Sequence, residues 1–369
     1  MLPGTRAGSC VVMAVLLAVL GSARAEETKE GIKVEGPASL VTLTLMQPTE
    51  RAVFQRSREN RAAVPVEGTF TGTAGRIEAR AVAMGGSRGP KTNWEVVDAA
   101  PAAGGFAGHL MAPAGGWYRI EVRALDGDKE VGQVSVERVG VGEVFITAGQ
   151  SNAANWGKPR QTAQDDRVSA ANVETGRWQA CADPQPGADG GGGSPWPAMG
   201  DLLAQRRDVP IGIISTGVGA TSVAQWQPDG LYGRIRSALK FVGKNGARAI
   251  LWHQGESDNV SGTTAEGYAR LLANIIKQSW VDAGREVPWG VALAAWHPAG
   301  RPGKQAAVIA GQRAVIQNVR GVFAGPDTDE MQAKGAFYRC DGVHFNERGL
   351  REHGRRWAEA ILGRGSGRR

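Results

Sequence analysis

One serine stands where a buried strand would deliver a nucleophile. Residues 144–148 are mostly apolar and β-prone, and Gly149-Gln150-Ser151-Asn152 follow them directly. A buried parallel strand typically presents polar residues at its carboxyl end. A serine hydroxyl reacts only when a base takes its proton and hydrogen-bond donors receive the oxyanion. A base, an orienting carboxylate and such donors must therefore come from the rest of the chain.

Asp341 and His344 are the best candidates for the base and the carboxylate that orients it. Two residues three positions apart can lie on the same side of a single turn, where one can orient the other. The alternative is a helix N-cap beside an exposed histidine, because a helical pattern follows at 347–362. The presence of Ser151 favours the catalytic interpretation. We predict Ser151, Asp341 and His344 as the catalytic residues.

After Gly140 the sequence alternates between strand and helix patterns. The predicted strands are 143–148, 211–215, 249–253, 289–295 and 321–324. The predicted helices are 196–206, 231–242, 265–280, 306–318 and 347–362. Such alternation predicts a parallel sheet with helices on both faces, whose strands all end at one edge. Polar clusters follow these ends at 149–152, 216–222, 253–258 and 341–344, so we predict the active site at this edge.

The part of the chain before Gly140 has a different pattern. Short alternating runs at 39–45, 76–82 and 117–124 are separated by Gly and Pro, which predicts an antiparallel β-sandwich. Its only histidine is His109, so we expect this part to pack, space or bind, not to catalyse. The predicted division is a β-sandwich domain at 32–140, a catalytic domain at 141–362 and a basic tail at 363–369.

The first 25 residues have the pattern of a cleaved signal peptide: Arg6, an apolar run at 11–20, and Ala23-Arg24-Ala25. The run is too short to span a membrane, so we predict no membrane anchor and a secreted or periplasmic protein. The formal charge of +7 is scattered apart from the tail, which does not favour nucleic acid as a partner. The sequence leaves the oligomeric state open.

The predicted mature chain has two cysteines, Cys181 and Cys340. In an exported protein such a pair can form a disulfide, and two independent buried thiols are the alternative. The sequence leaves both open. No set of His, Cys, Asp and Glu has the spacing of metal ligands, so we predict neither a metal nor a cofactor.

Oxyanion donors can be expected at the same edge. Gly219 offers a backbone N–H that no side chain obstructs, and Gln254 offers an amide NH₂ group. The backbone N–H of Ser151 would be the third donor. Glu256 and Asp258 could suggest the carboxylate pair of a glycosidase. Because they are two positions apart beside a buried strand, we expect them to order the loop instead.

Candidate substrate contacts are Gln150, Asn152, Trp226 and His297. Trp156, Trp196 and Trp296 fall in the same group of loops, where aromatic faces can stack on a sugar ring. Packing of the loops is the alternative interpretation for at least two of the tryptophans. We expect His253, at the end of a buried strand, to be structural, and His353, on the last helix, to face solvent.

Taken together, the motifs resemble those of the SGNH hydrolases. They are GQSN at 149–152, GATS at 219–222 with Gln225-Trp226 after it, WHQGESD at 252–258 and DGVHF at 341–345. The resemblance is to the sialate O-acetylesterase-type (SASA) branch, related to carbohydrate esterase family six, and covers about residues 141–362. The wider superfamily usually has Asn in the third block, whereas Gln254 matches this branch.

The resemblance implies a three-layer α/β/α, flavodoxin-like domain with a five-stranded parallel sheet, preceded by a small all-β sandwich. It implies Ser151 as nucleophile, His344 as base and Asp341 as its orienter, with Ser151 N–H, Gly219 N–H and the Gln254 side chain as oxyanion donors. The implied chemistry is removal of acetyl groups from sugar hydroxyls, with an acetylated carbohydrate as partner. The alternatives are a small-ester serine esterase of the same fold and a non-catalytic carbohydrate-binding protein.

Overall fold

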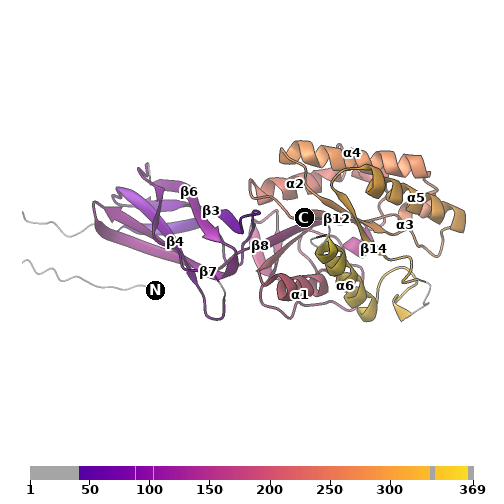
Figure 1. Cartoon of the computed structure of the whole chain (residues 1–369), viewed down its shortest axis with the longest axis horizontal. Coiled ribbons are helices and arrows are strands. Elements are labelled where there is room, and N and C mark those ends of the chain that lie inside the picture. Colours follow the sequence, from indigo (N-terminus) through magenta and orange to yellow (C-terminus); the bar gives the residue numbers. More distant parts are fainter. Residues whose placement is uncertain (1–40, 88, 103, 333–336, 365–369) are drawn as a thin grey trace, which may run out of the picture. The chain divides into compact units, whose positions relative to one another are not determined.

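The longest strand, β8 (Lys129–Gly149), runs through two different environments (Figure 1). Up to residue 138 none of its residues is fully buried, whereas every residue from Val139 onward is buried. The first part pairs with β7 (Gly115–Asp126) in antiparallel fashion. The last part pairs in parallel with β11 (Ile211–Ser215) and β12 (Ala249–His253). The change from half-buried to buried positions therefore coincides with the change of sequence pattern near Gly140.

The structure is a computed structural model that describes residues 41–87, 89–102, 104–332 and 337–364. The predicted signal peptide at 1–25 lies outside these residues, as do residues 365–369 of the predicted basic tail. Within the described ranges, no helix is long and apolar enough to cross a bilayer.

Alternating residues in the first part of the chain form strands that enclose an apolar core. One sheet has the order β1 (Thr42–Gln47), β3 (Arg61–Thr71), β6 (Gly105–Pro113). The other is built from β4 (Arg76–Ala83), β5 (Glu95–Asp98) and β7, with β2 (Val53–Gln55) beside β8. Both contribute to one apolar cluster in which Val64, Ile77 and Leu110 are fully buried. All pairings within this part are antiparallel except that of β2 with β8.

The sheet of the second part is larger than the five-stranded parallel sheet predicted from the sequence. Its order is β10-β9-β11-β8-β12-β13-β14, with β9 (Val168–Asn172), β10 (Arg177–Ala180), β13 (Trp289–Leu293) and β14 (Val322–Asp327). The five predicted strands are neighbours in it and run parallel. β9 adds a sixth parallel strand next to β11, and β10 is antiparallel at the edge.

The sequence pattern missed β9 because its residues are mostly small. Val168 is its only β-branched apolar residue, and the Ser-Ala-Ala sequence that follows has low strand propensity. The strand is buried because helix α1 (Trp196–Arg207) packs closely over it. A Cβ atom added to Gly200 would lie 2.4 Å from the Val168 side chain. Tertiary packing therefore outweighs the weak local preference.

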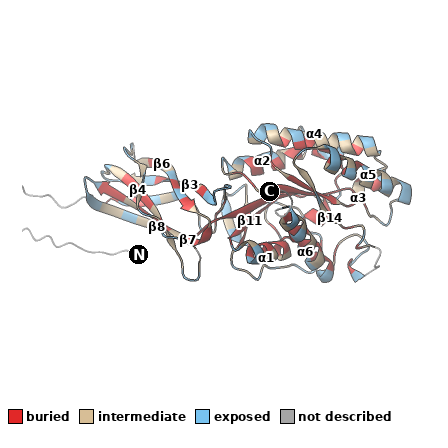
Figure 2. Cartoon of the chain, in the orientation of Figure 1, coloured by how far each residue is buried: buried red, intermediate tan, exposed pale blue. Residues whose placement is uncertain are grey.

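Helices cover both faces of this sheet, which gives the three layers that the sequence predicts. The helices are α1, α2 (Tyr232–Val242), α3 (Glu256–Ser261), α4 (Ala265–Ala283), α5 (Pro302–Asn318) and α6 (Glu347–Gly363). Val144 and Ile146 of β8 pack in the apolar cluster that includes residues of α2, α4 and α5. Phe145, on the other face, packs with residues of α1 and α6. Figure 2 shows buried strands between helices whose outer faces are exposed.

The two cysteines do not form a disulfide. Cys181 is a buried free thiol and Cys340 an exposed one. The second alternative, two buried thiols, is therefore also wrong for Cys340. The Cys181 thiol contacts the Gln185 side chain, and burial raises its pKa, so we expect it to be unreactive.

Candidate active site

The predicted polar clusters meet at one cavity of about 420 Å³ at the carboxyl edge of the sheet. Its lining residues are Gln150, Ser151, Trp156, Gly219, Ala220, Ser257, Val260, Ser261, His297, Val343 and His344. They come from the segments that follow β8, β11 and β13, from helix α3 after β12, and from the loop before α6. The convergence expected from the positions of the motifs is therefore present in the structure.

Ser151 is placed by the end of β8. Gly149 has φ +128°, and a Cβ atom there would lie 2.0 Å from the carbonyl oxygen of His253, so only glycine fits this close approach. Gln150 N–H donates to the same carbonyl at 3.0 Å, and Ser151 then begins a short 3₁₀-helix, Ser151–Ala153. Among the described residues no acceptor is bonded to the Ser151 N–H. This N–H can therefore serve as an oxyanion donor.

Asp341 and His344 form the expected pair. Asp341 Oδ2 lies 2.7 Å from His344 Nδ1, and Asp341 Oδ1 accepts the backbone N–H groups of Val343 at 2.9 Å and His344 at 2.7 Å. Partial burial opposes ionisation of Asp341, but these hydrogen bonds outweigh it and lower its pKa to about 2. A carboxylate on Nδ1 fixes the ring orientation and leaves Nε2 as the nitrogen that can act as base.

The nucleophile and the base line the same cavity without a direct bond between them. In this structure no hydrogen bond joins the Ser151 hydroxyl to the His344 ring, although both residues belong to the cavity wall. The Trp156 ring stacks on the His344 ring, with centroids 5.7 Å apart and 26° between the planes. Catalytic hydrogen bonds are often long before substrate binds, so the arrangement is compatible with a Ser-His pair.

Asp189 is a residue of this site that the sequence did not reveal. Its Oδ1 accepts the backbone N–H of Gly219 at 2.9 Å and the indole N–H of Trp156 at 3.0 Å. It belongs to the Gly- and Pro-rich stretch at 184–197, whose composition predicts a loop or a flexible cover. The stretch is held in place because Asn155 Nδ2 donates to the carbonyls of Gln185 and Ala188. The predicted oxyanion donor Gly219 is thus already occupied by a carboxylate.

Gln254 does not face the cavity. Its side chain is fully buried, and its amide nitrogen donates to Asp258 Oδ2 at 2.6 Å, to the Thr221 carbonyl at 3.0 Å and to Gln150 Oε1 at 3.2 Å. Tyr268 donates to Gln254 Oε1 at 3.0 Å. An amide NH₂ has two hydrogens, and three acceptors already surround them. In this arrangement Gln254 stabilises the loop and cannot serve as an oxyanion donor.

Asn152, predicted as a substrate contact, lies behind the cavity wall. It is buried, and its amide donates to Glu256 Oε1 at 2.8 Å and to the Val343 carbonyl at 3.3 Å. It therefore links the nucleophile loop to the loop of His344. Gln150 does line the cavity, and its Oε1 also accepts the Ser257 N–H at 3.1 Å. His297 lines the cavity as predicted.

Trp226, the preferred aromatic contact, is not at the surface. Its side chain is 0% exposed because the 3₁₀-helix Val223–Trp226 turns it into the core, where it packs edge-on against Trp252. Its indole N–H donates to Thr221 Oγ1 at 2.9 Å. Trp196 is also fully buried. The tryptophan exposed at the cavity is Trp156, at 43%.

The prediction that His353 faces solvent is wrong. His353 is fully buried, its ring centroid lies 4.8 Å from that of His253, and neither of its ring nitrogens has a hydrogen-bond partner. Burial lowers the pKa of His353 well below its ordinary value. The spacing of Leu350, His353, Trp357 and Ile361 places all four on one face of α6, a signal that the charge-rich composition of this helix obscured.

His253 and the acidic residues of the third motif are structural, as expected. His253 is buried, and its Nε2 lies 3.0 Å from Thr328 Oγ1. Asp258 Oδ2 accepts the Val223 N–H at 2.8 Å, and its Oδ1 accepts the Thr263 hydroxyl at 2.6 Å. In the part of the chain that the structure describes, no group of three or more His, Cys, Asp or Glu could hold a metal ion.

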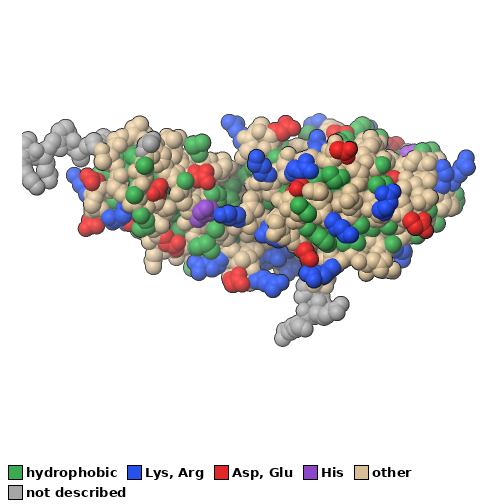
Figure 3. All heavy atoms as spheres, turned by 90° about the horizontal axis from the view of Figure 1, so that it is seen from above, with side chains coloured by type: hydrophobic (Ala, Val, Ile, Leu, Met, Phe, Trp, Pro, Cys, Tyr) green, Lys and Arg blue, Asp and Glu red, His purple; other side chains and the backbone are tan. Residues whose placement is uncertain are grey.

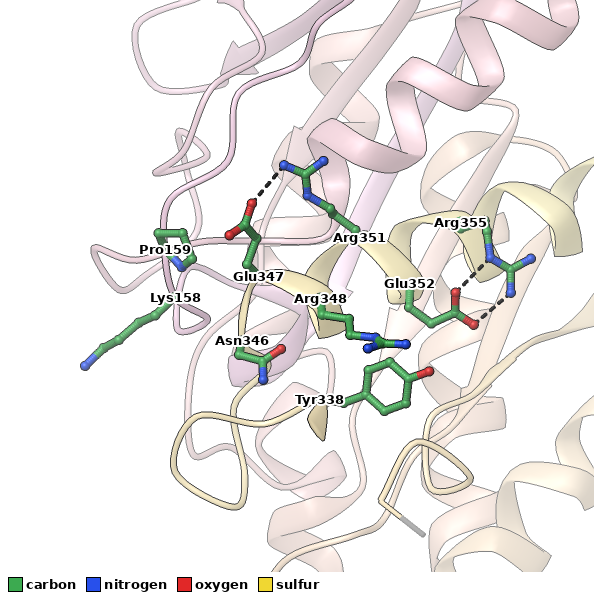
Figure 4. Close-up of a pocket in the computed structure, with 9 residues that line it drawn as sticks. All are labelled: Lys158, Pro159, Tyr338, Asn346, Glu347, Arg348, Arg351, Glu352 and Arg355. Carbon is green, nitrogen blue, oxygen red and sulfur yellow. Dashed lines mark hydrogen bonds and ion pairs between the residues drawn. The ribbon is translucent and has the colours of Figure 1, made fainter. Parts of the chain in front are cut away.

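A larger hollow of about 1080 Å³ lies beside the first turns of α6 (Figure 4). Its lining residues are Lys158, Pro159, Tyr338, Asn346, Glu347, Arg348, Arg351, Glu352 and Arg355. Arg351 pairs with Glu347 at 2.8 Å and Arg355 with Glu352 at 2.7 Å, as the figure shows. None of these lining residues is a serine, cysteine or histidine, so the smaller cavity is the one equipped for acyl transfer.

Comparison with known proteins places this site in a family. Residues 141–363 match the family model described as carbohydrate esterase, sialic acid-specific acetylesterase. A probable carbohydrate esterase from Arabidopsis thaliana is 27% identical over 161 residues, which cover 37% of this chain and 62% of that protein. The match thus spans less than two thirds of that relative's length.

Among solved structures, a carbohydrate acetylesterase from Xanthomonas citri superimposes with a TM-score of 0.56 at 21% identity, covering 87% of this chain and 76% of that chain. This likeness shows the fold. The family model covers more than half of the chain and agrees with the resemblance of the four sequence motifs. The chain belongs to the carbohydrate esterase family of sialic acid-specific acetylesterases.

Proposed function

We propose that this protein is an exported carbohydrate O-acetylesterase, of the sialate O-acetylesterase type, that works through an acyl-enzyme on Ser151. The observation that carries the proposal is the Asp341–His344 pair, bonded at 2.7 Å, on the wall of the cavity that also holds Ser151. Membership of a carbohydrate esterase family supports ester hydrolysis as the reaction class.

In the first step the Ser151 hydroxyl oxygen attacks the acetyl carbonyl carbon, and His344 Nε2 takes the hydroxyl proton. Asp341 stabilises the resulting imidazolium through Nδ1. The tetrahedral intermediate then expels the sugar oxygen, which receives the proton from His344, and leaves Ser151 acetylated. Water, deprotonated by His344, then attacks the acetyl carbonyl carbon. The second tetrahedral intermediate breaks its bond to the Ser151 oxygen, which takes the proton back from His344, and acetic acid leaves and ionises to acetate.

The oxyanion of the tetrahedral intermediate would be received by the N–H groups of Ser151 and Gly219. The second of these is bound to Asp189. Two negative oxygens about 4 Å apart repel by about 4 kcal/mol at an effective dielectric constant of about 20. We therefore infer that the Asp189 side chain turns away from Gly219 when the ester binds. The Trp156 indole, which shares the same carboxylate oxygen, would be released at the same time.

The cavity suits a small acyl group. Its volume of about 420 Å³ is at the low end of ligand sites, and its wall is mostly apolar, with Ser257, Ser261 and His297 among its polar residues. Trp156 offers an exposed aromatic face on which a sugar ring can stack. These features favour an acetylated sugar over an ester with a long acyl chain.

The decisive measurement is turnover of nitrophenyl esters from acetate to octanoate, followed by acetate release from acetylated xylans, pectins and sialosides. We expect acetate to be the best acyl group and at least one acetylated glycan to be hydrolysed. Faster turnover of octanoate than of acetate would count against the carbohydrate acetylesterase, whereas hydrolysis of the acetate ester without release from any glycan would favour a small-ester esterase of the same fold. If neither the nitrophenyl esters nor the acetylated glycans are hydrolysed, the result favours a carbohydrate-binding protein without catalysis.

Export is proposed on the signal pattern at 1–25. If the signal is cleaved after Ala25, the mature protein recovered from outside the cytoplasm begins at Glu26, which N-terminal sequencing can establish. A full-length chain that still begins at Met1 in the cytoplasmic fraction would contradict this part of the proposal.

A further inference from the structure

Basic and acidic side chains are interspersed over the face shown in Figure 3, as expected of ordinary solvated charge. A cavity of about 710 Å³ is a local exception. Its residues are Arg56, Ser57, Arg58, Asn60, Glu143, Phe145, Leu203, Arg207, Arg248, Ala249, Pro288, Phe323, Ile361 and Arg364. Five of them are arginines, and one is a carboxylate.

This cavity, the arginine cavity, lies at the edge of the sheet opposite to Ser151. It contains Glu143 and Ala249, which stand at the amino ends of the parallel pairings of β8 and β12. The active-site cavity lies beyond Gly149 and His253, at the other ends of the same two strands. A ligand in the arginine cavity would therefore be separate from the ester undergoing hydrolysis.

Both carboxylate oxygens of Glu143 accept hydrogen bonds, mostly from two of the arginines. Its Oε1 accepts Arg56 Nε at 2.9 Å and Arg56 Nη2 at 2.7 Å, and its Oε2 accepts Arg248 Nε and Gln55 Nε2. Burial opposes ionisation of Glu143, but the two guanidinium groups outweigh it and lower its pKa. One carboxylate neutralises only one of the two guanidinium groups, so this part of the cavity has a net positive charge.

The other three arginines have no such partner. Within the described part of the chain, no carboxylate forms an ion pair with Arg58, Arg207 or Arg364. The exposed Glu59 interacts with the charge of its neighbour Arg58. Arg364 lies over the Phe323 ring at 4.9 Å. Partial burial and the charge of Arg248 both lower the pKa of Arg364. The like charges thus lie close enough to repel one another.

Simple structural roles do not account for this convergence. Arg207 is in the last turn of α1, where it also stabilises the negative end of the helix, but Arg206 in the same turn does so without lining the cavity. Leu203 and Ile361 contribute apolar walls, which weaken the screening of charge by water. Positive charges that converge on a partly apolar cavity raise the local concentration of anions.

We propose that the arginine cavity binds a compact oxyanion of the phosphate or sulfate class that carries at least two negative charges. The guanidinium group presents paired N–H donors that match two oxygens of such an anion. Arg58, Arg207 and Arg364 supply the uncommitted donors, and Arg248 adds charge while it holds Glu143. The proposal is independent of the esterase function, because it involves none of the residues around Ser151.

The test is isothermal titration of the full-length protein with inorganic pyrophosphate, inorganic phosphate and inorganic sulfate at low ionic strength. We expect one site, tightest for pyrophosphate, with an affinity that falls as sodium chloride is added. Phosphate stronger than sulfate would identify a phosphorylated ligand, and the reverse a sulfated one. No detectable heat with any of the three at millimolar concentration would overturn the proposal.

Two variants locate the site. Arg207→Gln and Arg58→Gln should each weaken pyrophosphate binding about tenfold, whereas Arg206→Gln, with the same charge change in the same turn of α1, should leave it unchanged. Arg58 is in an exposed turn, so its replacement should not disturb folding, which circular dichroism can check. Equal losses in Arg206→Gln and Arg207→Gln would mean that binding follows net charge alone, and the proposal would be wrong. Ser151→Ala should bind pyrophosphate like the parent protein.

Discussion

The two ends of the last segment of β8 hold carboxylates in opposite ways. At the amino end, Glu143 is surrounded by the guanidinium groups of Arg56 and Arg248. At the carboxyl end, beyond Ser151, Asp189 is held by the neutral N–H groups of Gly219 and Trp156. Asp341 is likewise held by backbone N–H groups and the His344 ring.

This difference in partners separates a carboxylate with a structural role from carboxylates that act on the reacting groups. A carboxylate compensated by fixed cations has its charge neutralised locally, and removing it leaves cations unbalanced. A carboxylate held by neutral donors has no cation beside it, so its negative charge acts on other groups in the cavity. It can therefore stabilise a positive charge that forms on an imidazole, or oppose a negative charge that forms on an oxyanion. The predictions below test this contrast.

The largest effect is expected from removing the reactive group at the carboxyl end. Ser151→Ala should lower kcat for an acetyl ester by about 10⁴- to 10⁶-fold, because no acyl-enzyme can form. Thermal unfolding should show that the variant keeps its fold. Acetate release at the parent rate would contradict the assignment of Ser151 as nucleophile.

Asp341→Asn should lower kcat by about 10²- to 10⁴-fold, less than the loss of Ser151, because an amide cannot stabilise the imidazolium and favours the wrong tautomer. The low pKa of Asp341, about 2, also predicts a stability effect. Its folded pKa is below the ordinary 3.8, so its contribution is present above pH 3.8 and is lost as the pH falls toward 2. Acid unfolding of the variant should lack this component. If Asp341→Asn were as damaging as Ser151→Ala, the carboxylate would be as indispensable as the nucleophile.

At the amino end, the expected effect is on stability and not on chemistry. Glu143→Gln should lower the free energy of unfolding by about 2 kcal/mol, because it leaves Arg56 and Arg248 without their carboxylate. The figure is below that for a fully buried pair since the Arg248 side chain is 40% exposed. Chemical denaturation measures it. A change in kcat of more than about threefold at full folding would break the contrast between the two ends.

Asp189→Asn should raise kcat up to about tenfold. The amide oxygen can still accept the Trp156 and Gly219 N–H groups, while the charge that opposes the oxyanion is gone. Asp189→Ala, which also frees the indole, is the companion variant that separates charge from positioning. A fall in kcat for both variants would show that Asp189 supports catalysis by holding Trp156 and Gly219, and that it does not block the donor.

The smallest effect is expected behind the site. His353 is neutral in the folded protein because burial, the nearby His253 and the positive charges of Arg339 and Arg356 oppose its protonation. The unfolded chain takes up this proton below about pH 6.5, so stability is full above that pH and is lost as the pH falls. His353→Phe should reduce this loss by up to about 1.4 kcal/mol per pH unit, measured by denaturation between pH 5 and 7. An unchanged pH dependence would mean that His353 is protonated when folded.

Much of the fold and of the catalytic set is readable from local pattern. Continuous apolar runs predicted β8, β11 and β12, and the polar motifs after them predicted which side chains would meet, because parallel strands end at one edge. Asp341 and His344 are three residues apart, so their pairing needs only one turn of backbone. These features depend on residues that are close in sequence or on the general geometry of parallel sheets.

The remaining features depend on which distant segments pack together. Trp156 and Trp226 are the same residue type in loops at the same edge of the sheet. The 3₁₀-helix Val223–Trp226 buries Trp226, whereas Trp156 stacks on His344. The β9 strand and the contact of Asp189 with Gly219 likewise have no local signature. The sequence by itself determined which chemical groups are present and the edge at which they gather. Only the tertiary structure decided which donors remain free, because hydrogen-bond partners and burial are set by residues far apart in the chain.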